Sequence, residues 1–89
     1  MPFVLTENRI AYLQEGELLA EATFPEFGEG VVNIDHTLVD EALRGQGVAG
    51  QMLERIALSL RETGRKAVPT CSYAKKWFSQ HPEFSDVLR

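Results

Sequence analysis

One amphipathic helix constrains the fold of this chain more than any other sequence feature. Over residues 47–63, apolar residues recur every three or four positions, and polar residues occupy the opposite side. The apolar positions are Val48, Ala49, Met52, Leu53, Ile56, Ala57 and Leu60. Gly64 is the expected C-terminal stop, and Arg65 and Lys66 suit the negative end of the helix dipole. The pattern predicts a helix that packs on the core, and its apolar face needs no cofactor to explain it.

Three strands are expected before this helix. Residues 8–13 and 18–24 are rich in strand-forming side chains and flank a short segment that contains glycine, which predicts a β-hairpin. The apolar face of the second strand is expected to hold Leu18, Ala20, Ala22 and Phe24. Residues 25–30 contain a proline and two glycines, which predicts a turn that leads into a third antiparallel strand at 31–39.

A fourth strand, residues 66–71, follows the helix. A helical crossover separates it from the third strand, which predicts that the two run parallel. Pro69 has no N–H group for a sheet hydrogen bond, so pairing should fail near it and leave a gap between the parallel strands. Ligands of open α/β sheets commonly bind at the carboxyl ends of such strands. The alternative is that Pro69 only marks an edge strand.

A second, shorter helix is predicted after this strand. Ser72 suits its N-cap position, and Pro82 ends it. Its apolar face is expected to hold Tyr73, Ala74, Trp77 and Phe78. Lys75 and Lys76 fall on the solvated side, with contact to a cofactor phosphate as the alternative. Residues 81–84 are typical of a terminating turn, and residues 85–89 are too few to assign.

Length and charge limit the class of protein. The 89 residues form one domain, 1–89, with 44% hydrophobic and 25% charged residues, a balance typical of a soluble globular protein. A net charge of −4 without a basic run argues against nucleic-acid binding. The apolar runs are too short for a membrane span and the N-terminus lacks the features of a signal peptide, which predicts a cytoplasmic protein. The single cysteine, Cys71, cannot form an internal disulfide and fits a reducing compartment.

The best candidate binding site is the glycine-rich turn at residues 44–49, which opens the long helix. The first N–H groups of a helix have no intrahelical partner, and the helix dipole places partial positive charge there. Gly45 and Gly47 would let an anion approach the backbone, and Arg44 adds a charged fork. These features predict a phosphate or pyrophosphate site. The alternative is a turn whose glycines serve only steric needs.

Two further residues have both a chemical and a structural interpretation. His36 is expected on the core face of the third strand with Val32, Ile34 and Leu38, where a neutral imidazole beside a cleft could accept a proton from an amine or thiol. Its structural interpretation is a partly buried histidine bonded to the backbone. Cys71 lies just before a helix N-terminus, where a thiol tends towards a lowered pKa. Its structural interpretation is a small buried apolar residue.

Together, these motifs resemble those of a known superfamily. The segment Arg44-Gly45-Gln46-Gly47-Val48-Ala49 is similar to the acetyl-CoA pyrophosphate motif of the GNAT N-acetyltransferases, Gln/Arg-x-x-Gly-x-Gly/Ala. The likeness extends to His36-Thr37, Pro69-x-Cys71-Ser72-Tyr73 and His81-Pro82-Glu83-Phe84, as in the small stand-alone members of about this length. The resemblance covers nearly the whole chain, from about residue 8 to residue 84.

The resemblance implies a fold and a ligand. The fold is α+β with an α/β-like three-layer arrangement: a mixed antiparallel and parallel sheet with splayed parallel strands, one main helix and one or two short C-terminal helices. Acetyl-CoA would lie between the splayed strands, with its pyrophosphate on the amides of residues 46–49 and its pantetheine arm along Leu38 and Val39. The implied cofactor-binding residues are Leu38, Val39, Arg44, Gly45, Gln46, Gly47, Val48, Ala49, Ser72 and Lys75. No metal is implied.

The resemblance also implies acetyl transfer from acetyl-CoA to an amine, with His36 as general base and Cys71 as a thiol near the acetyl group. Direct attack of the amine is preferred, and prior acetylation of Cys71 is the alternative. A CoA-binding module with little catalysis is a second class of function.

The chain departs from the family pattern in two ways. Leu38 replaces an acidic residue common in related chains, and the N-terminal helices that build the acceptor site of larger members are missing. The acceptor, a small-molecule or protein amine, stays open, as does the choice between monomer and homodimer.

Overall fold

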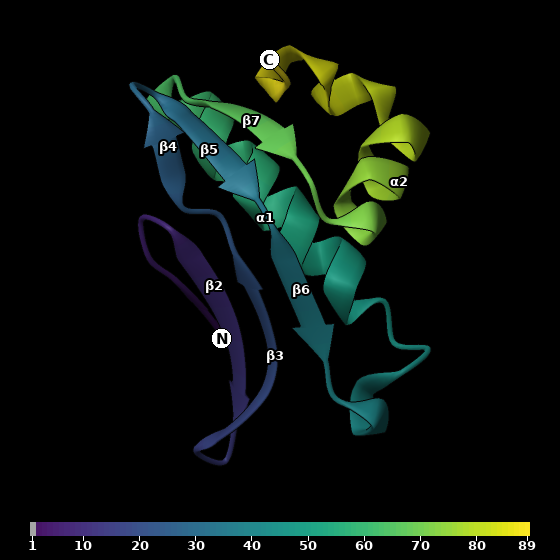
Figure 1. Ribbon diagram of the computed structural model, residues 1–89. Helices are drawn as coiled ribbons and strands as arrows, with labels where there is room; N and C mark the ends of the chain where they lie inside the picture. Colours follow the sequence, from purple (N-terminus) through teal and green to yellow (C-terminus); the bar gives the residue numbers. More distant parts are fainter. Residues whose placement is uncertain (1) are drawn as a thin grey trace.

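The computed structural model describes residues 2–89, which form a mixed α+β domain (Figure 1). In chain order the elements are β1 (Phe3–Leu5), β2 (Arg9–Gln14), β3 (Glu17–Thr23), β4 (Glu26–Gly28), β5 (Val31–Ile34), β6 (His36–Val39), the 3₁₀ helix η1 (Glu41–Leu43), α1 (Val48–Thr63), β7 (Lys66–Pro69), α2 (Ser72–Gln80) and the 3₁₀ helix η2 (Pro82–Val87). The strands form two sheets, in the orders β1-β2-β3-β6 and β4-β5-β7. The predicted fold class is confirmed, with the strands divided between two sheets.

The four-stranded sheet is built on the predicted hairpin. β2 and β3 pair antiparallel, with a register shift after Tyr12. Ala20, Ala22 and Phe24 are buried as predicted, whereas Leu18 beside the hairpin turn is exposed. β1, which the sequence pattern did not indicate, pairs with β2 and adds an edge strand. A strand of three residues is too short for its alternation to be recognised in the sequence.

The strand predicted over residues 31–39 is interrupted at Asp35. β5 pairs with β7 in one sheet, and β6 pairs with β3 in the other. Between them, Asp35 is anchored to Thr23, because its carboxylate accepts a bond from the Thr23 hydroxyl at 2.5 Å and its N–H donates to the Thr23 carbonyl at 3.3 Å. The prediction of one continuous strand is therefore wrong, and Asp35 marks the point where the chain changes sheets.

This interruption also changes which side chains face the core. Val32 and Ile34 are fully buried, as expected for the inner face of β5. His36 and Leu38 are exposed, and the residues that follow them in β6 are half-buried instead. The prediction that His36 and Leu38 face the core is wrong, because Asp35 shifts the alternation by one residue and thereby exchanges the two faces.

The parallel pair and the gap beside it are confirmed. β5 and β7 run parallel in register as far as Ile34 opposite Pro69. Beyond Pro69, the N–H groups of Thr70 and Cys71 both donate to the Ile34 carbonyl at 3.1 Å, so this part of the chain stays bonded to the end of β5. β6 and β7 then diverge without pairing (Figure 1).

The long helix α1 begins and ends at glycine residues, as predicted. Gly47 and Gly64 have φ values of 71° and 74°, a region that suits glycine because it has no β-carbon. The N–H of Arg65 donates to the Leu60 carbonyl at 2.9 Å and closes the C-terminal turn. The buried face is the predicted one apart from Ala49, which is half-buried: it consists of Val48, Met52, Leu53, Ile56, Ala57 and Leu60.

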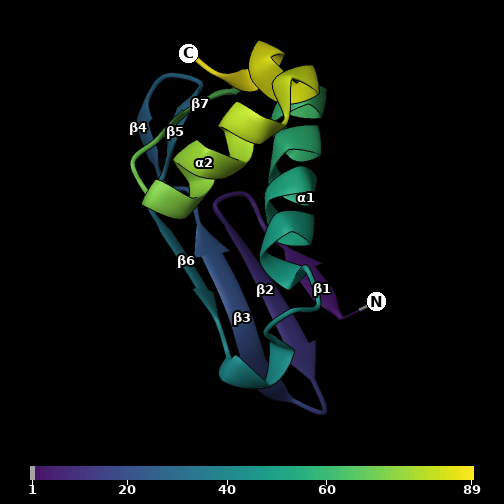
Figure 2. The same cartoon turned by 90° about the vertical axis from the view of Figure 1, so that its right-hand side faces the viewer.

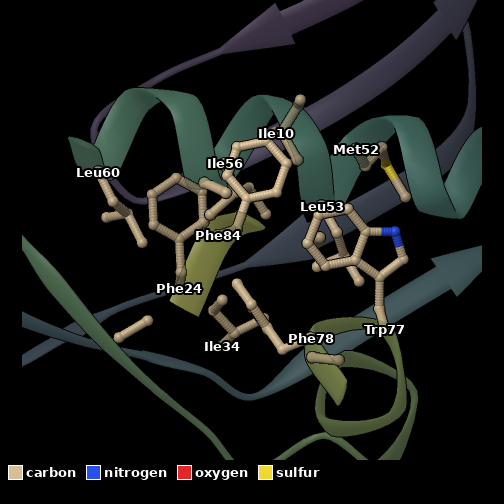
Figure 3. Close-up of a cluster of buried hydrophobic side chains, with 14 of the residues drawn as sticks. Ile10, Phe24, Ile34, Met52, Leu53, Ile56, Leu60, Trp77, Phe78 and Phe84 are labelled. Atoms are coloured by element: carbon tan, nitrogen blue, oxygen red, sulfur yellow. The ribbon is translucent and has the colours of Figure 1, made fainter. Parts of the chain in front are cut away.

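One hydrophobic core joins both sheets to the helices. α1 packs along one side of the sheets, and α2 lies beside the point where β6 and β7 diverge (Figures 1 and 2). Figure 3 shows Phe24 from the hairpin and Ile34 from β5 in the same cluster as the α1 side chains. Trp77 packs edge-on to Phe78, with ring centroids 5.0 Å apart, and stacks near Phe84 at 5.6 Å. Trp77 and Phe78 therefore lie in the core, as predicted, and Phe84 packs with them.

Several short elements differ from the predictions. The segment at 25–30, expected to be a turn, contains β4, an edge strand that pairs with β5. Ser72 is the first residue of α2, because Cys71 occupies the N-cap position. Tyr73, expected on the apolar face of α2, is 42% exposed. Residues 82–87 form the 3₁₀ helix η2, where a turn and an unassigned tail were expected.

In residues 2–89, no helix is long and apolar enough to cross a membrane.

Candidate functional site

A cleft of about 410 Å³ opens where the glycine-rich turn meets β6 and the start of α2. Its lining residues are Thr37, Val39, Leu43, Arg44, Gly45, Gly47, Val48, Ala49 and Tyr73. Three separate parts of the chain supply them: β6, the segment from η1 to α1, and α2. This volume is within the range of small-molecule sites. The cleft lies beside the divergence of β6 and β7, where the sequence pattern predicted a ligand site.

The floor of the cleft at the start of α1 is suited to an anion. Gly45 and Gly47 have φ values of 80° and 71°, and the space where their β-carbons would lie is open. Leu43 is buried and anchors the turn, while Arg44 stays exposed at the rim. Within the described chain, α1 has no side-chain N-cap bond and no acidic residue in its first turn. The first N–H groups and the positive end of the dipole are therefore left for a ligand.

Thr37 connects the cleft to the single cysteine. Its hydroxyl lies 3.3 Å from the Cys71 sulfur, across the gap between β6 and β7. Burial raises the pKa of the Cys71 thiol, but the hydrogen bond from Thr37 and those from the N–H groups of Ala74 and Tyr73 outweigh it and hold the pKa below its usual value. Cys71 is thus a half-buried thiol with a lowered pKa; it does not line the cleft itself but contacts Thr37, which does.

Tyr73 is a cleft residue that the sequence interpretation missed. It was predicted to be a core side chain, yet it is exposed and lines the cleft together with the glycine-rich turn. The sequence held a hint of this position, because a tyrosine at the edge of the apolar face of a helix usually keeps its hydroxyl near water or a hydrogen-bond partner. Its hydroxyl, which can donate and accept a proton, lies 3.9 Å from the position that a β-carbon of Gly50 in α1 would take.

His36 and Leu38 lie on the other face of β6. Successive side chains of a strand point to opposite faces, so Thr37 faces the cleft and its two neighbours do not. The His36 ring is half-exposed, with its Nε2 atom 3.9 Å from a carboxylate oxygen of Glu21. The same carboxylate accepts a bond from the Arg9 Nε atom at 2.6 Å. His36 therefore belongs to a polar cluster on the outer face of the sheet, next to the gap.

The remaining predicted site residues divide into two groups. Val39, Arg44, Gly45, Gly47, Val48 and Ala49 all line the cleft. The side chains of Gln46, Ser72 and Lys75 do not line it and are exposed. Gln46 instead donates through its Nε2 atom to the Ala42 carbonyl at 3.4 Å. Its contribution to an anion site would come from the backbone N–H group, as the family resemblance implies. No group of three or more histidine, cysteine, aspartate or glutamate residues in 2–89 could hold a metal ion.

The comparisons with known proteins identify an acetyltransferase of the GNAT type. The family model described as GCN5-related N-acetyl-transferase matches residues 8–87, and the chain belongs to this family. The chain is similar to a GCN5-like protein from Staphylococcus aureus solved by NMR, with 32% identity, a TM-score of 0.81, and coverage of 98% of this chain and 86% of the other. No curated protein sequence matches the chain.

Two larger proteins of known structure share the fold. An N-acetyltransferase from Staphylococcus aureus Mu50 has 21% identity and a TM-score of 0.65, with 83% of this chain and 50% of the other covered. An IAA acetyltransferase from Bacillus cereus has 16% identity and a TM-score of 0.63, with 81% and 51% covered. This chain thus spans about half the length of these two proteins, and the likeness at this identity concerns the fold alone.

Proposed function

We propose that this protein is an acetyl-CoA-dependent N-acetyltransferase whose thioester lies in the cleft between β6 and α2. The observation that carries the proposal is that one cleft joins the glycine-rich turn at the start of α1 to Thr37, which lies at the gap between β6 and β7. The pyrophosphate of acetyl-CoA would bind the first N–H groups of α1, with Arg44 beside it. The pantetheine arm would run along Thr37 and Val39 and bring the acetyl group towards Cys71.

The acceptor amine would approach through the gap from the outer face of the sheets. That face carries His36, which stands next to the gap and beside the Glu21 carboxylate. The amine nitrogen attacks the acetyl carbonyl carbon, a C–N bond forms, and the C–S bond to CoA breaks. His36 accepts the proton that the nitrogen loses. The hydroxyl of Tyr73, a residue that lines the cleft, donates a proton to the leaving thiolate and regains one from solvent.

Binding and turnover test this proposal in sequence. Calorimetry with acetyl-CoA should show binding at submillimolar concentration, and its absence would refute the proposal. A panel of primary amines is then assayed for release of free CoA. Acetylated product with at least one amine is expected, whereas binding without turnover for the whole panel would indicate a CoA-binding module.

The His36→Gln variant tests the route of the proton. We expect kcat to fall about 10²-fold, which is at the lower end of the usual contribution of a general base. The KM for acetyl-CoA should stay unchanged, because His36 lies outside the cleft. An unchanged kcat would remove His36 from the mechanism.

Transfer through Cys71 is the second candidate mechanism, and the lowered thiol pKa favours it. Direct transfer is preferred because a step from one thioester to another gains little energy. Mass spectrometry after incubation with acetyl-CoA and no acceptor separates the two. Direct transfer predicts no stoichiometric acetyl-Cys71 and an active Cys71→Ser variant. Full acetylation confined to Cys71, with an inactive variant, would establish the covalent route instead.

A further inference from the structure

The edge strand β1 leaves one row of its backbone groups without a partner strand. Among residues 2–89, β1 pairs with β2 alone, at the end of the four-stranded sheet opposite β6. The Pro2 carbonyl accepts a bond from β2 and the Thr6 N–H donates one to β2, both at 2.8 Å. Because the direction of bonding alternates along an antiparallel strand, the N–H and C=O groups of Phe3 and Leu5 point away from β2, along the open edge.

The other free edges are protected in ways that β1 is not. β4 carries Glu26, and its pairing with β5 has a register shift. The free side of β7 is covered by the C-terminal segment, through a parallel bridge between Ala67 and Leu88. Natural sheets usually block an edge with charges, proline, bulges or a covering segment, whereas β1 consists of three apolar residues. β1 is therefore the edge best suited to pair with a strand of another chain.

An exposed apolar surface continues from β1 onto α1, which lies beside it (Figure 2). Val4, Leu5 and Leu58 are 46%, 44% and 46% exposed. A groove of about 250 Å³ runs between the strand and the helix. Its lining residues are Phe3, Leu5, Arg55, Leu58, Ser59 and Glu62. Val4 points to the opposite face of the sheet, so a strand that pairs with β1 would cover apolar side chains on both faces.

Two opposite charges flank Leu58 on the exposed side of α1. Arg55 precedes it by three positions and Glu62 follows it by four. The guanidinium carbon of Arg55 lies 4.4 Å from the centre of the Phe3 ring, so the basic end of the groove is level with the start of β1. Among residues 2–89, neither charge forms a salt bridge. This pattern is self-complementary, because a two-fold rotation about its centre places each charge opposite the other.

We infer that β1 pairs with β1 of a second copy of this chain and forms a two-fold symmetric dimer. Antiparallel pairing centred on Val4 sets Phe3 opposite the partner's Leu5, and each such pair exchanges backbone hydrogen bonds in both directions. The same axis brings Arg55 opposite the partner's Glu62. The interface closes on itself, because both copies use the same surface and no further copy can pair with β1.

The dimer leaves both clefts open. β1 and β6 are the opposite edges of the four-stranded sheet, so the interface lies far from the residues of β6 that line the cleft. The dimer is therefore independent of the proposed function. A variant that loses the dimer should keep the wild-type affinity for acetyl-CoA in calorimetry if the wild type binds it.

Sedimentation equilibrium over a dilution series measures the dimer directly. The wild type should reach twice the mass of a single chain. Val4→Lys sets like charges opposite each other at the axis and should weaken dimerisation by about 10-fold or more. Leu18→Lys is the matched control, because Leu18 is 44% exposed at the hairpin turn, and it should have no effect. A wild type that is monomeric at every concentration, or equal losses in the two variants, would overturn the inference.

Reversed charges test the register of the dimer. Arg55→Glu and Glu62→Arg should each weaken the homodimer by about 10-fold or more, because like charges then face each other across the axis. An equimolar mixture of the two variants should form a heterodimer, in which opposite charges meet on both sides of the axis. Failure of the mixture to associate, when each variant unfolds cooperatively, would contradict this register.

Amide hydrogen exchange reports on the strand itself. The N–H groups of Phe3 and Leu5 should exchange more slowly as the protein concentration rises, because the partner strand accepts their bonds. The N–H of Val4 is the internal control, since it points towards β2 in each copy and should change less. Exchange at Phe3 and Leu5 that does not depend on concentration, in a protein that dimerises, would place the interface elsewhere.

Discussion

At the scale of single residues, the chemistry of the site depends on which face of β6 a side chain occupies. Thr37 faces the cleft and bonds to Cys71, whereas His36 faces outward towards Glu21. These neighbours therefore serve different sides of the same gap. The chemical state of Cys71 depends directly on its surroundings, because hydrogen bonds lower a pKa that burial would otherwise raise.

The Thr37→Val variant should make Cys71 a weaker nucleophile at neutral pH. The alkylation rate of wild-type Cys71 by iodoacetamide should rise with pH to a midpoint below that of an ordinary cysteine, because only the thiolate reacts. Removal of the Thr37 hydroxyl should move this midpoint to higher pH. Thr70→Val is the control, since the Thr70 hydroxyl donates to Asn33 at 2.8 Å and not to the thiol. Equal midpoints in wild type and Thr37→Val would show that the hydrogen bond has no effect on the thiol.

At the scale of elements, α1 and its two terminal glycines connect the core to the site. The helix buries one face against both sheets and presents its open N-terminus to the cleft. η2 packs back on the same helix, because Arg61 of α1 donates to Asp86 at 2.6 Å and 2.9 Å and to the Glu83 carbonyl at 2.8 Å. The C-terminal segment is thereby held over the core.

Gly47→Ala and Gly64→Ala form a matched pair that separates stability from binding. Both glycines have positive φ values and open space around them, so an alanine meets only backbone strain. We expect each variant to lose about 1–2 kcal/mol of unfolding free energy in urea titrations. Affinity for CoA should fall only for Gly47→Ala, which lies at the anion site. A similar loss of affinity in Gly64→Ala would mean that the change in affinity comes from the general loss of stability.

The Arg61–Asp86 hydrogen bonds between α1 and η2 should make the stability of the folded protein depend on pH in the acidic range. The hydrogen bond from Arg61 holds the pKa of Asp86 below its usual value, so the folded state favours the carboxylate. This contribution is present above the unfolded pKa of about 3.9 and is lost as pH falls through the folded value. Asp86→Asn should therefore lower Tm at pH 7, and the difference from wild type should shrink towards pH 2. A constant difference across this range would contradict the assignment.

At the scale of the whole molecule, a single core links two sheets that diverge on either side of the site. Phe24, which is fully buried, follows β3 and lies in the same cluster as the α1 side chains (Figure 3). Packing on both sides holds the two sheets apart where β6 leaves β7. The opening at the site is thus a consequence of how the core is packed.

Phe24→Ala should come close to unfolding the protein. Truncation of a buried phenylalanine costs about 3–5 kcal/mol, against a total stability of roughly 4–13 kcal/mol for a domain of this length. Phe27→Ala is the matched control, because Phe27 is 56% exposed on β4 and its loss should cost at most about 0.5 kcal/mol. Thermal unfolding followed by circular dichroism measures both. Equal effects would show that the core does not depend on Phe24.

The sequence by itself determined the local features: the hairpin, the bounds and buried face of α1, the parallel strand β7 and the glycine-rich turn. Each depends on short-range periodicity or on residues with special backbone freedom, such as Gly47, Gly64 and Pro69. These same residues predicted where the cleft lies. The family resemblance, carried by the turn and the C-terminal motifs, agreed with the family model that matches residues 8–87.

Only the tertiary structure decided which side chains share the cleft. Asp35 interrupts the predicted strand because Thr23, twelve positions earlier, binds both its carboxylate and its N–H group. That one contact exchanges the faces of β6, turning His36 outward and Thr37 inward. Tyr73 likewise becomes a wall of the cleft because α2 meets the start of α1. Such outcomes depend on contacts between distant segments, which periodicity within one strand or helix cannot reveal.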